Sequence, residues 1–99
     1  MTKGYVILTE AVHDPDGMRA YGESAATSLA EHRPAVLVVD NHVEVLEGEW
    51  HGNATIVLEF ESVEAARKWY HSESYQAARP LRQAAADCNV IIASGFTPP

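Results

Sequence analysis

The order of its apolar runs and helical segments constrains the fold of this chain more than any other feature of the sequence. Four runs are rich in β-branched and aromatic residues, which favour strands. Two segments repeat apolar residues every three or four positions, which is typical of amphipathic helices. The expected order is therefore strand, helix, strand, strand, helix, strand. The strands are predicted at residues 5–12, 35–46, 54–60 and 89–93, and the helical segments at residues 15–32 and 62–86.

Short polar motifs indicate where the helices begin. Asp14 suits an N-cap position because Pro15, which follows it, fits the first turn of a helix. Ser62 suits the N-cap of the second helical segment. Ser72 suits a further N-cap inside that segment, so a break is expected there, and Ser72 is better explained as a cap than as a nucleophile.

Turn residues and prolines predict the remaining irregularities. Residues 40–42 interrupt an apolar run, and we expect them to form a bend or bulge within one long second strand. Residues 48–53 carry the glycines and asparagine of a hairpin loop. After the break, we expect one turn at residues 74–78 and a short last helix at residues 80–86.

The predicted order is that of a ferredoxin-like βαββαβ fold, an α+β arrangement with a four-stranded antiparallel sheet and both helices on one face. The helices can cover only that face. Nevertheless the strands are apolar on both faces, since Leu58 and Phe60 point to one side of the third strand and Val57 to the other. The sequence therefore predicts a homodimer, in which a second copy covers the exposed face.

Length and charge narrow the class of protein. The 99 residues suit a single domain spanning residues 1–99. The net charge of -7 repels phosphate backbones and anionic lipids, so neither nucleic acid nor a membrane is an expected partner. The chain has one cysteine, no apolar run near the ~20 residues of a membrane span, and no signal-peptide pattern at its start. A cytoplasmic location is expected.

Aromatic and basic residues are concentrated between residues 57 and 82. This stretch holds one of the two tryptophans, two of the four tyrosines and four of the seven basic residues. Together with Tyr21 of the first helix, Trp69 and Tyr75 could shape a pocket for a flat ligand, although they could equally be core. The guanidinium of Arg82 suits an acidic ligand or a neighbouring carboxylate.

Two residues are candidates for proton transfer. Glu59 lies in an apolar strand and could be a general base or an anchor for a ligand cation, although an ion pair with Arg82 or Arg79 is the more common role for such a residue. His42 lies at the predicted bend and could be an acid–base group near neutral pH. No residue spacing matches a metal site or a phosphate-binding loop, so neither a metal nor a cofactor is expected.

With these motifs in place, the chain resembles a family named as domain of unknown function 1330, within the dimeric α+β barrel superfamily. The resemblance implies a ferredoxin-like protomer and a dimer built from paired sheets, but no substrate. More distant superfamily members include cofactor-free oxygenases, isomerases, dehydratases and haem-degrading enzymes. The chain departs from the family pattern where glycines are expected near the second strand. The matching residues are 3–5, 45–50, 59–60, 65–66, 69–76 and 81–82.

Two functions follow from these observations. The first is a small homodimer whose pocket, between helices and sheet, binds a small aromatic or acidic metabolite and transforms it without a cofactor. The alternative is a non-catalytic structural or stress- or pathway-associated dimeric module. An ion pair between Glu59 and Arg82 in a filled core would favour the module, whereas an open cavity with unpaired polar groups would favour binding.

Overall fold

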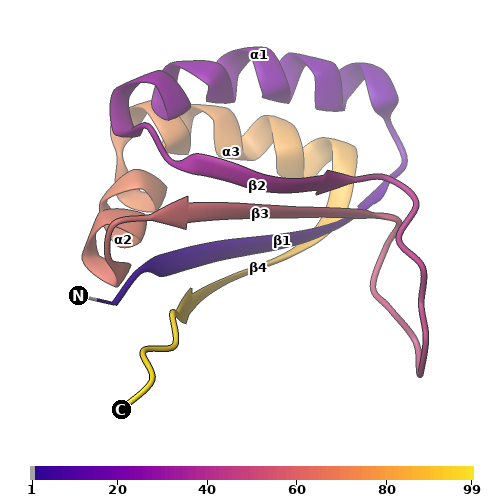
Figure 1. Ribbon diagram of the computed structural model, residues 1–99. Coiled ribbons are helices and arrows are strands. Elements are labelled where there is room, and N and C mark those ends of the chain that lie inside the picture. The colour runs from indigo at the N-terminus through magenta and orange to yellow at the C-terminus, as the bar shows by residue number, and fades with distance from the viewer. Residues whose placement is uncertain (1) are drawn as a thin grey trace.

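A four-stranded antiparallel sheet carries three helices in the computed structural model, which describes residues 2–99 (Figure 1). The strands lie in the order β2-β3-β1-β4, so the βαββαβ order and the ferredoxin-like fold are confirmed. Among the residues that the structure describes, no helix is long and apolar enough to cross a bilayer. The elements are β1 (Gly4–Val12), α1 (Pro15–His32), β2 (Ala35–Asp40), β3 (Ala54–Phe60), α2 (Val63–His71), α3 (Glu73–Ala85) and β4 (Ala86–Ser94).

All three predicted N-caps are confirmed. The side chain of Asp14 accepts a hydrogen bond from the Gly17 amide at 3.1 Å, and Pro15 stands in the first turn of α1. Ser62 caps α2 through the Ala65 amide at 3.0 Å. Ser72 caps α3 through the Tyr75 amide at 3.2 Å. Each cap satisfies an amide that the helix itself leaves without a partner, so local sequence fixes where these helices start.

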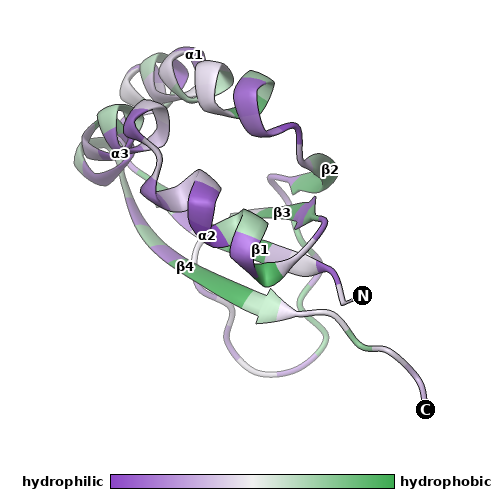
Figure 2. Cartoon of the chain, turned by 90° about the vertical axis from the view of Figure 1, so that its left-hand side faces the viewer, coloured by the Kyte–Doolittle hydropathy of each residue, from purple (hydrophilic) through white to green (hydrophobic). Residues whose placement is uncertain are grey.

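The prediction of one long second strand reaching residue 46 was wrong. β2 ends at Asp40, whose side chain accepts a hydrogen bond from the His42 amide at 2.7 Å. This local bond turns the chain away from the sheet, as aspartate often does. The irregularity in β2 lies earlier, between Val36 and Val38, where the register with β3 shifts. Residues 41–53 form a loop on the side of the sheet opposite the helices (Figures 1 and 2).

The prediction of a turn followed by a separate last helix was also wrong. α3 is one helix of 13 residues that runs through Pro80. A proline inside a helix removes a backbone hydrogen bond. Tyr75, Ala78 and Arg82 are nevertheless all buried at spacings of three and four residues, so packing of this face holds the helix across the proline. β4 begins earlier than predicted, at Ala86.

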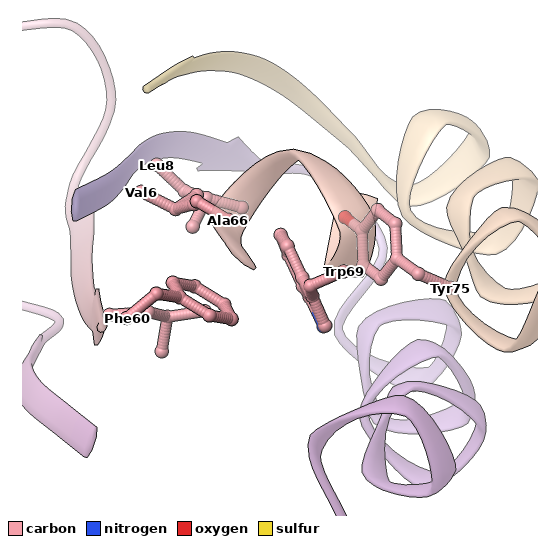
Figure 3. Packing of buried hydrophobic residues seen from close by; sticks show 7 residues of the cluster. Val6, Leu8, Phe60, Ala66, Trp69 and Tyr75 are labelled. Atoms are coloured by element: carbon pink, nitrogen blue, oxygen red, sulfur yellow. The ribbon is translucent and has the colours of Figure 1, made fainter. Parts of the chain in front are cut away.

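The core lies between the sheet and the helices. Figure 3 shows the indole of Trp69 between the rings of Phe60 and Tyr75, beside β1. The side chains of alternate strand residues reach this core because they share one face of the sheet. The buried cluster comprises Val6, Leu8, Leu58, Phe60, Ala66, Trp69 and Tyr75.

The other face of the sheet carries a continuous apolar row. The strand register aligns Ile7 of β1 with Val57 of β3 and Ile91 of β4, and Val57 with Val38 of β2. Ile91 is 54% exposed, and no helix covers this face in Figure 1. The expectation of strands that are apolar on both faces is confirmed.

Candidate functional site

An apolar pocket of about 270 Å³ lies between α1 and the sheet. Its walls come from α1, from the facing strands and from α2. Three residues with polar side chains, Glu10, Tyr21 and Asn41, line it, and Asn41 comes from the loop after β2. The lining residues are Leu8, Glu10, Met18, Tyr21, Gly22, Ala25, Leu29, Val39, Asn41, Ile56, Leu58 and Trp69.

Glu10 is the one acidic residue in this pocket. It is only 4% exposed, because it lies in β1 in the same phase as the core residues Val6 and Leu8. No hydrogen bond to its carboxyl group is found within residues 2–99. Burial raises the pKa of Glu10, and the positive charge of Arg82 offsets this only in part. The carboxyl group is thus open to the pocket and not satisfied by the protein.

A chain of hydrogen bonds leads from Arg82 to the pocket. The Nε of Arg82 donates to the hydroxyl of Tyr75 at 3.1 Å, and the hydroxyls of Tyr75 and Tyr21 are 3.0 Å apart. Burial and the neighbouring Tyr75 raise the pKa of Tyr21 well above its ordinary value, so the phenol stays protonated. Tyr21 can therefore present a hydrogen-bond donor to a ligand.

Trp69 lines the pocket and also belongs to the core. Its ring centroid lies 4.1 Å from that of Tyr75 and 5.6 Å from that of Phe60. Its indole Nε1 donates to Ser28 Oγ at 3.1 Å, and Ser28 is fully buried in α1. This bond ties α2 to the helix that forms the roof of the pocket.

The structure brings the four predicted ligand-binding residues together but gives them different positions. Tyr21 and Trp69 line the pocket. Tyr75 and Arg82 do not line it: Tyr75 is hydrogen-bonded to Tyr21, and Arg82 to Tyr75. Arg82 does not line the apolar pocket, so its charge acts through Tyr75 and on Glu10.

The predicted coupling between Glu59 and Arg82 was wrong. Glu59 accepts a hydrogen bond from the Tyr5 hydroxyl at 2.8 Å, and no ion pair between Glu59 and Arg82 exists within residues 2–99. Tyr5 pairs with Glu59 at one end of β1, whereas Glu10 and its neighbour Arg82 lie five residues further along, ~17 Å away. The two side chains belong to different regions.

The two candidates for proton transfer lie outside the apolar pocket. Neither Glu59 nor His42 lines it. His42 is exposed in the loop after β2, where its amide bonds to Asp40. Glu59 lines a separate, more polar cavity of about 360 Å³ beside Lys3 and Arg33. Glu10 is the carboxyl group in the apolar pocket.

Sequence reasoning missed Glu10 and Ser28. The signal for Glu10 was available, because it follows Val6 and Leu8 at intervals of two in a predicted strand. A charged residue in the core phase of a strand is unusual enough to mark a site. Ser28 gave no such signal, because a serine in a helix is ordinarily exposed.

A second, more open cavity of about 390 Å³ lies along the start of β4, and its lining is mainly polar. It includes His51, Arg82 and Cys88. Burial raises the pKa of the Cys88 thiol, which is the opposite of what an activated nucleophile needs. Within residues 2–99, no three His, Cys, Asp or Glu side chains are placed to hold a metal ion. The apolar pocket is therefore the better candidate site.

Comparison with known proteins supports the resemblance drawn from the sequence. A family model described as "Domain of unknown function (DUF1330)" matches residues 3–96. No curated protein matches.

Solved structures share the fold. A protein of unknown function from Rhodopseudomonas palustris is 20% identical with a TM-score of 0.74, over 97% of this chain and 84% of that one. A hypothetical Arabidopsis thaliana protein is 15% identical with a TM-score of 0.68, over 97% and 90%. SnoaB, a cofactor-independent oxygenase from Streptomyces nogalater, is 12% identical with a TM-score of 0.61, over 98% and 95%. At these identities the likeness shows the fold alone.

Proposed function

The chain belongs to the DUF1330 family, and we propose that it binds a small, flat, mostly apolar molecule in the pocket between α1 and the sheet. The observation that carries this proposal is Glu10, a buried carboxyl group without a hydrogen-bond partner within residues 2–99, at the wall of an otherwise apolar pocket. A buried polar group costs free energy unless something satisfies it. A bound ligand with one polar group would do so.

The pocket also suits the ligand in size and shape. Its volume of about 270 Å³ is slightly below the usual range of ligand pockets, ~300 to ~1,000 Å³, and so suits a small molecule of one or two rings. Apolar walls with a few polar groups are the usual composition of such sites. SnoaB, with the same fold, is described as a cofactor-independent oxygenase, which supports chemistry without a cofactor as part of the proposal.

The alternative is a non-catalytic structural or stress- or pathway-associated module. Its support is the dense packing of the motif, because Trp69 and Tyr75 are almost completely buried. The open pocket beside them and the absence of a Glu59–Arg82 ion pair within residues 2–99 favour binding.

Ligand binding can be tested by thermal shift with aromatic acids, quinols, cyclic ketones and small keto acids. We expect wild type to be stabilised by a matching compound, by about 2.7 kcal/mol at a hundred times its dissociation constant. Gly22 lines the pocket, and a Cβ at this position would meet nothing within 4 Å. Gly22→Leu should therefore fill the pocket and remove the shift without unfolding the protein.

Gly22→Ala is the matched control. It gives α1 the same helix-propensity gain over glycine, about 1 kcal/mol, but adds only one methyl group to the pocket. We expect it to keep the ligand shift. The proposal fails if no compound stabilises wild type, or if Gly22→Leu and wild type respond equally.

We also propose that the chain works as a homodimer in the cytoplasm. The apolar row formed by Val38, Val57, Ile7 and Ile91 supports a second copy as the cover of the helix-free face. Light scattering at micromolar concentration should give a mass near twice 10.8 kDa. Ile91→Glu should give the monomer mass, because it places a charge in the row, whereas Leu81→Glu on α3 should not. A wild-type monomer under these conditions would contradict the dimer.

A further inference from the structure

The pocket also carries the parts needed for a proton transfer. Resting on the binding function proposed above, we propose that Glu10 is a catalytic base that moves a proton on a neutral cyclic ketone, while the Tyr21 hydroxyl binds the ketone oxygen. This assignment names a substrate class, an enolisable carbonyl compound, and a reaction class, isomerisation through an enolate.

Glu10 has the surroundings of a base. Its side chain lines the pocket together with the aliphatic side chains of Leu8, Ile56 and Leu58, and the residue is 4% exposed. Burial raises its pKa above the ordinary value of 4.5, which makes its carboxylate a stronger proton acceptor. The titratable groups that act on it are Tyr21 from α1, Arg82 from α3 and Cys88 from β4.

The hydrogen-bond chain allows an arrangement in which Tyr21 donates to the substrate. Arginine has no acceptor, so the Tyr75 oxygen must accept from Arg82 Nε. Either hydroxyl of the Tyr75–Tyr21 pair can be the donor, and the proposal uses the arrangement in which Tyr75 donates to the Tyr21 oxygen, 3.0 Å away. This arrangement leaves the Tyr21 hydrogen free to point into the pocket. The positive charge of Arg82 opposes the rise in the pKa of Tyr21 that burial causes, and so favours a hydrogen bond from Tyr21 to a developing negative oxygen.

The step balances without an oxidant or reductant. The Glu10 carboxylate takes a proton from the carbon beside the carbonyl group, and the electrons of that C–H bond form the C=C bond of an enolate. The negative charge moves to the carbonyl oxygen, which accepts the hydrogen bond from Tyr21. Glu10 then returns the proton to the same carbon, or to the far end of a conjugated double bond, which shifts that double bond. At the end of the step Glu10 is again a carboxylate, and Tyr21 is still a neutral phenol.

The surroundings favour a neutral substrate over an acidic one. Arg82 does not line the apolar pocket, and within residues 2–99 no lysine or arginine side chain lines it to face a bound anion. The Glu10 carboxylate and the net charge of -7 both oppose a carboxylate ligand. The apolar walls and Trp69 suit a ring system.

The proposal can be tested with 2-indanone, a flat bicyclic ketone whose C–H groups beside the carbonyl are acidic. Proton NMR in deuterated buffer would follow replacement of these protons by deuterium, and thermal shift would follow binding. We expect wild type to accelerate exchange, with a rate that rises with pH through a midpoint above 4.5. Glu10→Gln should lose ~10²–10⁴-fold in the exchange rate. Tyr21→Phe should lose ~10²–10³-fold.

The controls separate this proposal from ligand binding itself. Glu59→Gln removes a carboxyl group outside the pocket and should exchange at the wild-type rate. Glu10→Gln should still bind 2-indanone, because it keeps the size of the side chain. Binding without accelerated exchange, or exchange unchanged in Glu10→Gln, overturns the catalytic role and leaves the binding function standing. Absence of binding to wild type overturns both.

Discussion

Trp69→Ala is expected to lower the free energy of unfolding by about 3–5 kcal/mol, the usual cost of truncating a large buried aromatic side chain. Trp69 is 1% exposed and packs against Phe60 and Tyr75 at the centre of the core. The substitution also leaves the buried Ser28 hydroxyl without the indole that donates to it. Urea denaturation of wild type and variant at 25 °C would measure the difference.

Trp50→Ala is a suitable control for this prediction. Trp50 is half-exposed in the loop between β2 and β3, and its loss should change the free energy of unfolding by about 0.5 kcal/mol or less. If Trp69→Ala cost less than about 1 kcal/mol, Trp69 would not have the core role described here. The part of the pocket wall formed by Trp69 would then contribute little to the free energy of unfolding.

Arg82→Met is expected to cost about 2–4 kcal/mol at pH 7, because a buried hydrogen bond from a charged group is lost and Glu10 keeps a buried charge without compensation. Arg82 is 3% exposed, and its Nε donates to the Tyr75 hydroxyl. Methionine fills a similar volume, so little of the loss should come from a cavity. Arg67→Met, at an exposed ion pair with Glu64, should cost about 1 kcal/mol or less.

The cost of Arg82→Met should depend on pH through Glu10. Burial raises the pKa of Glu10, so its neutral form stabilises the fold fully below about 4.5, and this stabilisation is lost as the pH rises through the folded-state pKa. Removing Arg82 raises that pKa further. The substitution should therefore cost less at pH 4 than at pH 7. Adding Glu10→Gln should recover part of the loss. Equal costs at both pH values, with strict additivity in the double variant, would show that Glu10 and Arg82 do not interact.

Much of the fold could be predicted because its signals are local. The caps at Asp14, Ser62 and Ser72 each act within three residues, and the order of apolar runs is legible without any tertiary contact. The errors arose where contacts between residues far apart in the sequence determine the local structure. Packing against the core, and not helix propensity, carries α3 across Pro80.

That same error explains why the candidate site was only partly predicted. With a helix expected to break before Pro80, Arg82 had no fixed orientation relative to Tyr75. In one continuous helix they are seven residues apart and lie on the same face, so Arg82 reaches Tyr75 and not Glu59. The aromatic residues were recognised from their type and number. Glu10 was overlooked because its phase in β1 was not compared with that of its neighbours.

The register shift in β2 has a consequence for how the protein avoids forming fibres. β2 is an edge strand, and all six of its residues are exposed, five of them apolar. A regular apolar edge offers its free backbone groups to a strand of any other chain, and such pairing can continue without end. The extra residue at Leu37 spoils the even spacing of those groups and twists the edge. The register shift at Leu37 thus limits the addition of strands from other chains to this edge of the sheet.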